Sequence, residues 1–431
     1  MSITQRIVNV FRSSQRPEPP EPGRLVQPRK EDSWRDYPAD GLTPARLAQI
    51  LRAADEGALD AAMQLYEQME EKDAHLFSVA NTRRLALTGL PWQVVSAADV
   101  VEGLDRALAD EAADYCREQL TELDGFDEAL QHLALAMGRN IAIAELLWQA
   151  EGSGHRLAGI VPVDFTRIVF DELDRPRILT EQEPYKGIEL PANKFVVHTP
   201  HSVSGHPSRG GLLRVSALAF LGKHYAVKDW LVFAEVFGMP VRIARYEPSA
   251  TPQEKRELLE MLQKLGSDAA GIFSKAVELE LVEARGGGGR APYQAIAEFF
   301  NREISKAWLG QTLTTDTAGT TGTFAAARIH EQVRQDLRED DIRKEARTIR
   351  QQVLRPVAQF KFGLEVPVPY FRRKMDLPRD LRELADVLAV AVNELGIRVP
   401  RRWAHEMLGI PEPTRAEAVL DNRPSGRRAS K

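Results

Sequence analysis

Residues 324–354 form the longest run of helical periodicity in the chain, and this run constrains the fold more than any other feature. At 1.5 Å per residue, such a helix would extend on the order of 45 Å. Charged side chains cover most of its circumference, and the acidic pair Asp340 and Asp341 is expected on its solvated face. The apolar positions make only a narrow stripe, which consists of Ile329, Val333, Leu337, Ile349 and Val353.

A helix this long with so narrow an apolar stripe is too exposed for a compact monomer. It is typical of helices that pack against neighbours or copies of themselves. Pro356 is predicted to end it, because proline lacks the amide donor that a helix interior needs.

The composition is that of an ordinary globular protein, with 43% hydrophobic and 28% charged residues in 431. The 57 basic and 62 acidic side chains give a net charge of -5, which argues against a tight, sequence-reading DNA binder. Cys116 is the single cysteine, so no internal disulfide can form. The sequence has no run of roughly 18 apolar residues and no secretory signal at its start, so we expect no membrane association and synthesis in the cytoplasm.

The first half of the chain begins with an arm. Residues 1–40 carry repeated prolines and are expected to be flexible. Helices are predicted from Thr43 onward, but Leu85 to Val95 is predicted as a strand with a turn, and 127–151 as another helix. Alternating patterns over 158–200 predict short antiparallel strands between two helical blocks. The fold class is therefore α+β and mainly helical.

The second half of the chain is also predicted to contain helices separated by short strands. The predicted helices cover 212–237, 251–265 and 291–309, with strands at VRIARY and at VELELVEA (277–284). The glycines at 286–289 are predicted to form a flexible link, since no phosphate-loop Lys-Ser follows them. A strand-like KFGLEVPVPY follows the long helix, then a small helical tail.

Three histidines fall within nine residues: His198, His201 and His206. Clustered imidazoles can bind zinc, and a metal-dependent hydrolase is the alternative function that they suggest. Their spacing fits no common zinc site, and no G-x-S-x-G elbow or phosphate loop is present. We therefore predict a protein that is not an enzyme and carries no metal and no cofactor.

The segment GQTLTTDTAGTTGT (310–323) is rich in Thr and Gly and is predicted to be an irregular loop. Its short uncharged side chains offer weak, rearrangeable hydrogen bonds. A surface that must touch phosphates without gripping them would have this character, because each Lys or Arg contact adds salt-sensitive binding. An ordinary surface loop would also have this composition.

The chain resembles the Mu-like phage portal proteins from roughly residue 35 to 421. The resemblance is carried by DGLTPARLAQILRAADEG, HLFSVANTRRLALTGLPWQVV and LPANKFVVHTPHSVSGHPSRGGLLR. It is most specific in KDWLVFAEVFGMPVRIARY together with WLGQTLTTDTAGTTGTFAAARIHEQVRQDLREDDIR. A second alternative, another head-tail adaptor protein, would be expected to be far shorter.

The resemblance implies a portal-type fold with a wing, a helical stem, a small β-containing clip and a helical C-terminal region. It implies a homo-oligomeric ring, usually a dodecamer, at the capsid vertex of the virion. Double-stranded DNA would pass through the channel of this ring without sequence specificity. The implied partners are the terminase large subunit, the head-tail connector, and the major capsid protein with its scaffold.

The resemblance also implies a division of the chain into parts. Either the strands of 158–200 or those of 241–284 could form the clip, and the second set is favoured because it lies between the two stem helices. The parts are a flexible arm (1–40), a wing-like α+β region (41–211), stem helices (212–309) with a clip-like insert at about 241–290, a tunnel loop (310–323), a long wing helix and strand (324–376), a crown-like helical region (377–421) and a disordered basic tail (422–431).

The same resemblance assigns the DNA-facing side chains to the tunnel loop. These residues are Thr312, Thr314, Thr315, Asp316, Thr317, Thr320 and Thr321.

Overall fold

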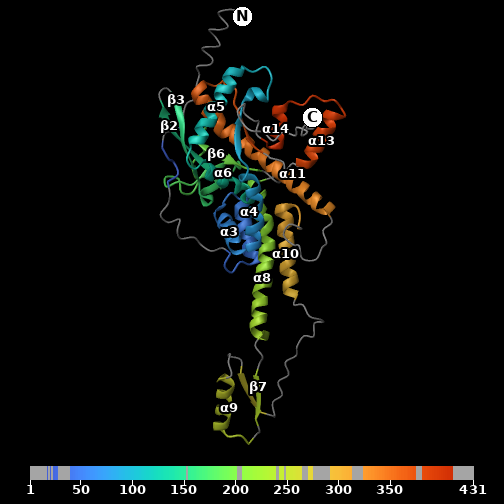
Figure 1. The fold of residues 1–431 in the computed structure, drawn as a ribbon. Coiled ribbons are helices and arrows are strands. Elements are labelled where there is room, and N and C mark those ends of the chain that lie inside the picture. The colour runs from blue at the N-terminus through green and yellow to red at the C-terminus, as the bar shows by residue number, and fades with distance from the viewer. Residues whose placement is uncertain are drawn as a thin grey trace, which may run out of the picture. The chain divides into compact units, whose positions relative to one another are not determined.

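The structure is a computed structural model, shown as a ribbon in Figure 1. Its contacts divide the chain into two units, Met1–Arg373 and Lys374–Lys431, which are described separately. The residues that the structure describes are 17, 20, 23–27, 39–151, 154–200, 206–238, 242–246, 249–264, 270–274, 292–312, 324–374 and 381–410.

Three helices open the first unit, and polar caps set where two of them begin. The Thr43 hydroxyl accepts a hydrogen bond from the Arg46 amide, and Asp73 accepts from the amides of His75 and Leu76. The helices are α2 (Pro44–Asp55), α3 (Asp60–Lys72) and α4 (Ala74–Thr88).

The strand predicted from Leu85 to Val95 is wrong in its first half, because Leu85 and Leu87 lie in α4. Asp73 caps the start of this helix, and the high helix propensity of Leu and Ala favours its continuation to Thr88. Only β1 (Trp92–Val95) is a strand, and it pairs antiparallel with β9 (Tyr370–Arg373). The predicted KFGLEVPVPY strand therefore begins later than expected, at Tyr370.

The helix predicted over 127–151 is also wrong beyond its first turns. Asn140 adopts a left-handed conformation (φ 63°) and ends the helical segment, after which β2 (Ala142–Glu151) begins. The first half of β2 is buried on both faces, and an apolar run of that kind cannot be distinguished from a buried helix by periodicity. The helices before it are α5 (Arg106–Glu122), α6 (Phe126–Ala134) and α7 (Ala136–Arg139).

The antiparallel strands predicted within 158–200 are confirmed. The central sheet has the order β3-β2-β6, with a bulge in β2 between Leu147 and Trp148. A separate pair, β4 with β5, follows β3 along the chain. The strand bounds are β3 (Gly154–Pro162), β4 (Ile168–Phe170), β5 (Pro176–Ile178) and β6 (Phe195–His198).

Two long helices, α8 (Leu212–Gly238) and α10 (Pro292–Leu309), lie side by side (Figure 1). Both helices agree with the predicted ranges 212–237 and 291–309. Between them in sequence is a small parallel βαβ unit, with a capping box between Thr251 and Glu254 at the start of its helix. Its elements are β7 (Arg242–Tyr246), α9 (Pro252–Lys264) and β8 (Ala270–Ser274). The strand predicted at 277–284 and the glycine link lie outside the described residues.

The long helix does not end at Pro356. After α11 (Phe324–Ile349), the chain makes one π-helical turn (Arg350–Leu354) and continues as α12 (Arg355–Phe362). Pro356 lies in the first turn of α12, where a missing amide donor costs little.

The π-helical turn places Gln352 against β6, the outer strand of the central sheet. The Val197 amide donates to Gln352 Oε1 at 2.7 Å, and Gln352 Nε2 donates to the Val197 carbonyl at 2.9 Å. One side chain thus satisfies both main-chain groups of an edge residue that would otherwise need a neighbouring strand.

Two hydrophobic clusters hold the first unit together. One joins α2, α3 and α4 to α8 and α10, with Trp308 at 0% exposure. The other joins α5 and α6 to the central sheet and α12, with Phe360 and Phe371 buried. The second unit contains α13 (Leu381–Asn393) and α14 (Arg401–Leu408), which confirms helices in the predicted tail. None of the helices in the described part of the chain has the length and hydropathy to cross a membrane.

Candidate functional site

The helix pair α8 and α10 depends on close packing at a glycine. A Cβ atom on Gly222 would lie 2.3 Å from the Phe300 ring, so a larger residue here would require this ring to move. Nearer the end of α10, Trp308 Nε1 donates to Ser216 Oγ at 3.0 Å, and Ser216 Oγ donates to the Leu212 carbonyl. Both side chains are buried, so this chain of hydrogen bonds fixes the register of α10 on α8.

Polar contacts also fix the pair to α4. Lys223 of α8 forms a 2.7 Å ion pair with Asp73, the capping residue of α4. His75 Nε2 lies 2.8 Å from the fully buried Ser305 Oγ of α10. Burial, followed by the positive charge of Lys223, lowers the pKa of His75, so this imidazole is neutral at pH 7.

The end of α10 is clamped by Arg83 of α4. Arg83 Nη1 donates to the Trp308 carbonyl at 2.9 Å, in the last turn of α10. Arg83 Nε and Nη2 donate to the two carboxylate oxygens of Asp341 on α11, at 2.9 and 3.1 Å. A single guanidinium therefore joins three helices by a bidentate pair and a carbonyl cap.

Asp341 was predicted on the solvated face of the long helix, and this prediction is wrong. Asp341 is 5% exposed, because its face of α11 is turned toward α4 rather than toward solvent. Its neighbour Asp340 is partly exposed and pairs with Lys344 along the helix.

The predicted tunnel loop begins at this clamp. Gly310 has a left-handed φ of 67° and closes α10 through a hydrogen bond from its amide to the Lys306 carbonyl. Gln311 is buried beside it, and Thr312 is partly buried. The other predicted DNA-facing residues lie outside the described residues: Thr314, Thr315, Asp316, Thr317, Thr320 and Thr321.

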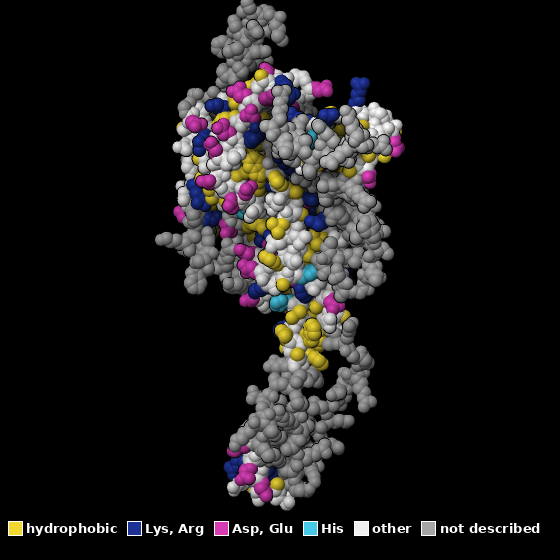
Figure 2. Space-filling view, viewed as in Figure 1, with side chains coloured by type: hydrophobic (Ala, Val, Ile, Leu, Met, Phe, Trp, Pro, Cys, Tyr) yellow, Lys and Arg dark blue, Asp and Glu magenta, His cyan; other side chains and the backbone are white. Residues whose placement is uncertain are grey.

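The helix pair carries an apolar surface on the described part of the chain. Leu218 and Leu231 of α8 are 68% and 67% exposed, and Phe299 of α10 is 50% exposed. Figure 2 shows hydrophobic side chains gathered on this part of the molecule. A groove of about 500 Å³ runs between the two helices, with Val215, Leu218 and Phe299 in its lining. Exposed apolar patches of this kind indicate a surface that another molecule covers.

The histidine cluster does not assemble as a metal site among the described residues. His198 is buried, and its Nδ1 lies 2.9 Å from Thr348 Oγ1 on α11. His206 lies 3.0 Å from Asp174 and 2.9 Å from Ser208 Oγ, while His201 lies outside the described residues. No group of three or more possible ligands occurs in the part of the chain that the structure describes.

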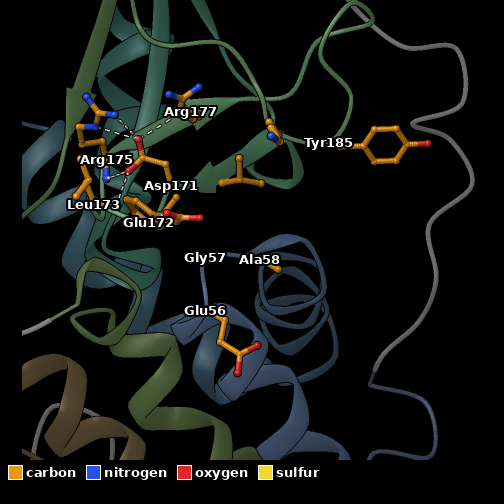
Figure 3. Close-up of a pocket in the computed structure, with 12 residues that line it drawn as sticks. Glu56, Gly57, Ala58, Asp171, Glu172, Leu173, Arg175, Arg177 and Tyr185 are labelled. Atoms are coloured by element: carbon orange, nitrogen blue, oxygen red, sulfur yellow. Dashed lines mark hydrogen bonds and ion pairs between the residues drawn. The ribbon is translucent and has the colours of Figure 1, made fainter.

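A hollow of about 570 Å³ lies beside the β4–β5 hairpin (Figure 3). Its central carboxylate, Asp171, accepts hydrogen bonds from the amides of Leu173 and Arg175 and from the guanidinium groups of Arg175 and Arg177. Desolvation raises the pKa of Asp171, but these hydrogen bonds outweigh it and the net pKa is lowered. Figure 3 shows Tyr185 lying well apart from this network. The carboxylate thus shapes a turn, and the hollow brings no acid–base pair together.

Comparison with known proteins places this arrangement in a class. Residues 63–410 match the family model described as "Portal protein of Mu bacteriophage". Because the match covers most of the chain, the protein belongs to the Mu phage portal family, and its mainly helical α+β architecture is a portal-type fold.

Two relatives agree with this assignment. The chain is 31% identical over 392 residues to the Mu-like prophage FluMu protein gp29 of Haemophilus influenzae, covering 90% of this chain and 74% of that protein. It is 30% identical over 393 residues to the portal protein of Escherichia phage Mu, covering 90% and 75%.

The similarities to solved structures are weaker in sequence identity. A chain from the virion of a native gene transfer agent particle is 12% identical, with a TM-score of 0.47, and covers 96% of this chain and 100% of that one. An HK97 family phage portal protein from Corynebacterium diphtheriae is 12% identical, with a TM-score of 0.37, covering 77% and 94%.

The Arg83 clamp was not predicted from the sequence, although the long helix carries a signal for it. Asp341 and Glu345 follow Val333 and Leu337 at intervals of four residues, so both carboxylates lie on the apolar stripe of the long helix. A charge on a buried stripe predicts a buried partner of opposite sign. Arg83 itself, within TRRLALT, carries no comparable signal.

Proposed function

We propose that the chain is the ring-forming subunit of a phage portal, and that copies of it surround a channel through which double-stranded DNA enters and leaves the capsid. The observation that carries this proposal is the exposed apolar surface along α8 and α10. A monomer gains nothing from exposed Leu218, Leu231 and Phe299, whereas the neighbour in a ring would cover them. Head-to-tail contacts of this kind close when the rotation between subunits completes a circle.

The parts of the chain follow from this proposal. The helices α8 and α10 would form the stem within 212–309, and the βαβ unit between them would lie in the clip, at about 241–290. Residues 41–211 would form the wing, 324–376 the long wing helix and strand, and 377–421 the crown. The ring would be a dodecamer.

DNA contact is assigned to the tunnel loop, residues 310–323. Its Thr and Gly composition would let phosphates pass without strong binding, since only Asp316 carries a fixed charge. The clamp of Arg83 on Trp308 and Asp341 supports this role, because it fixes the point from which the loop starts.

The protein would act as a structural part and not as an enzyme. The motor that consumes ATP would be the terminase large subunit, docked on the ring during packaging. The head-tail connector would bind later, and the major capsid protein and its scaffold would surround the ring at the vertex of the virion. Assembly would take place in the host cytoplasm.

The first test is the native mass of the purified protein, together with negative-stain images of the same sample. We expect a closed ring with a central hole. A matched pair of variants tests the surface itself: Leu218→Glu on α8 and Leu173→Glu on the turn after β4, since these leucines are 68% and 72% exposed.

Leu218→Glu should prevent ring closure, because it buries a charge in the proposed subunit contact, and Leu173→Glu should leave the ring intact. Rings of normal mass from Leu218→Glu would exclude this surface as the subunit contact. A wild-type chain that stays monomeric, even with scaffold present, would oppose the portal proposal as a whole.

A further inference from the structure

Glu145 and Lys194 form a buried ion pair that has no role in the portal proposal. Glu145 lies on β2 and Lys194 lies just before β6, and their side chains are 1% and 0% exposed. Their charged groups are 3.3 Å apart. Two charges removed from water at this depth need further hydrogen bonds to offset the cost of desolvation.

Those hydrogen bonds come from the N-terminal arm, about 120 residues away in sequence. The amides of Leu25 and Val26 donate to Oε1 and Oε2 of Glu145 at 2.6 and 3.0 Å. Lys194 Nζ donates to the Gly23 carbonyl at 2.5 Å. The carboxylate therefore receives two consecutive amides, and the ammonium caps a carbonyl two residues upstream.

The charged pair contacts only main-chain groups of the segment, and the segment adds one buried side chain, Val26. Val26 alone in the segment 23–27 is buried, at 4% exposed, while Leu25 is partly buried and Arg24 and Gln27 are exposed. Gly23 has a φ of 95°, a left-handed conformation that a residue with a side chain rarely adopts. These five residues lie within the arm (1–40) that the sequence predicts to be flexible, and these hydrogen bonds join them to the central sheet.

The arm sequence fits such a site. Pro22 and Pro28 flank the segment, but none of the residues from Gly23 to Gln27 is proline, so the two required amide donors are present. Prolines around a short free segment restrict the unbound arm and lower the entropy lost on docking.

We propose that Glu145 and Lys194 form a peptide-binding site that recognises a short segment by its main-chain amides and carbonyl, with Gly23–Gln27 as its ligand. The site can accept this segment from a second copy of the chain as well as from its own, because the groups that it contacts are the same whichever chain supplies the segment. Where copies lie side by side, the arm of one subunit can thus tie it to the next. This proposal does not depend on the channel.

The direct test supplies the segment in trans to the full-length chain. A Leu25→Pro/Val26→Pro variant removes both amide donors and empties the site. A fluorescent peptide of residues 20–30 should bind this variant saturably. The wild-type chain should bind the peptide at least tenfold more weakly, because its own arm occupies the site at high effective concentration.

Two controls separate main-chain recognition from general adhesion. The same peptide with N-methyl groups on Leu25 and Val26 keeps every side chain and loses both donors, so it should bind at least tenfold more weakly. Adding Glu145→Gln/Lys194→Met to the emptied variant removes both buried charges together and should also weaken binding at least tenfold. Equal binding of the N-methylated peptide would refute the proposal, and so would no binding by an emptied variant with native circular dichroism.

If the emptied variant does not fold, trypsin provides the test in the wild-type chain. The bond after Arg24 carries the Leu25 amide that Glu145 holds, so cleavage there should be slow relative to cleavage after Arg29. Glu145→Gln/Lys194→Met should speed cleavage after Arg24 at least tenfold. An unchanged ratio of the two rates would overturn the proposal.

Discussion

Arg373 and Glu345 form a buried ion pair that ties the strand β9 to the long helix α11. Arg373 Nε and Nη2 donate to the two carboxylate oxygens of Glu345 at 2.8 and 2.7 Å, and Nη1 donates to the Leu90 carbonyl at 2.6 Å. Burial raises the pKa of Glu345, although Arg373 opposes this effect. With the Arg83–Asp341 pair, one turn earlier on α11, it accounts for the orientation of the long helix.

Removing one partner of this ion pair should lower the free energy of unfolding far more than replacing both partners. Arg373→Met leaves the Glu345 carboxylate buried and alone, and we expect the free energy of unfolding to fall by about 3–5 kcal/mol. The double variant Arg373→Met/Glu345→Leu should stay within about 1–2 kcal/mol of the wild type, because no unpaired charge remains. Urea denaturation of the three proteins measures both values. Equal losses in the single and double variants would show that the pair contributes only through packing.

Gly222→Ala should separate α8 from α10. The added methyl group would meet the Phe300 ring at 2.3 Å, and overpacking of this kind costs about 1–3 kcal/mol. Gly222→Ala combined with Phe300→Leu should recover part of the loss, because the smaller side chain makes room. Thermal denaturation gives the comparison. A Gly222→Ala protein with unchanged melting temperature would contradict the close contact of α8 with α10.

The sequence predicted the helices α8, α10 and α11 well, because each has a long run with helical period. It failed at β2, where burial on both faces removes the alternation that identifies a strand, and at Pro356, where a π-helical turn lets the helix continue. These errors share one cause, which is that tertiary packing overrides the local pattern.

The same cause limits what could be predicted of the site. The Thr- and Gly-rich composition of 310–323 can be read from the sequence, but Arg83 acts only because α4 is folded against α10 and α11. Glu145, Lys194 and Gly23 come together from three distant segments of the chain. No spacing within the sequence encodes such contacts.

Stability should fall with acid because of His132. Burial lowers the pKa of this imidazole to about 4, and its Nε2 lies 3.0 Å from the Ile143 carbonyl. The folded protein binds the proton more weakly than the unfolded chain, whose histidine has a pKa near 6.5, so stability is complete above pH 6.5 and is lost as pH falls toward 4. Between pH 7 and pH 5 the contribution should drop by about 2 kcal/mol.

His132→Gln should flatten this part of the pH profile, because glutamine can still donate to the Ile143 carbonyl and does not titrate. Urea denaturation at pH 7, 6 and 5 measures both proteins. Parallel profiles for wild type and variant would assign the acid sensitivity to other groups.

Lysines at positions 314 and 315 should make the proposed ring bind DNA more tightly. Thr314→Lys/Thr315→Lys adds two positive charges per subunit where phosphates are proposed to pass, so double-stranded DNA should be retained more tightly. The slope of log K against log salt should steepen by about 0.9 for each phosphate newly contacted. Packaging by particles that contain such rings should slow for the same reason.

The matched control, Thr121→Lys/Gln131→Lys, adds equal charge on exposed positions of α5 and α6 and should leave the slope near its wild-type value. If both double variants change the slope equally, the added charge acts through general attraction, and the loop does not line the path of the DNA.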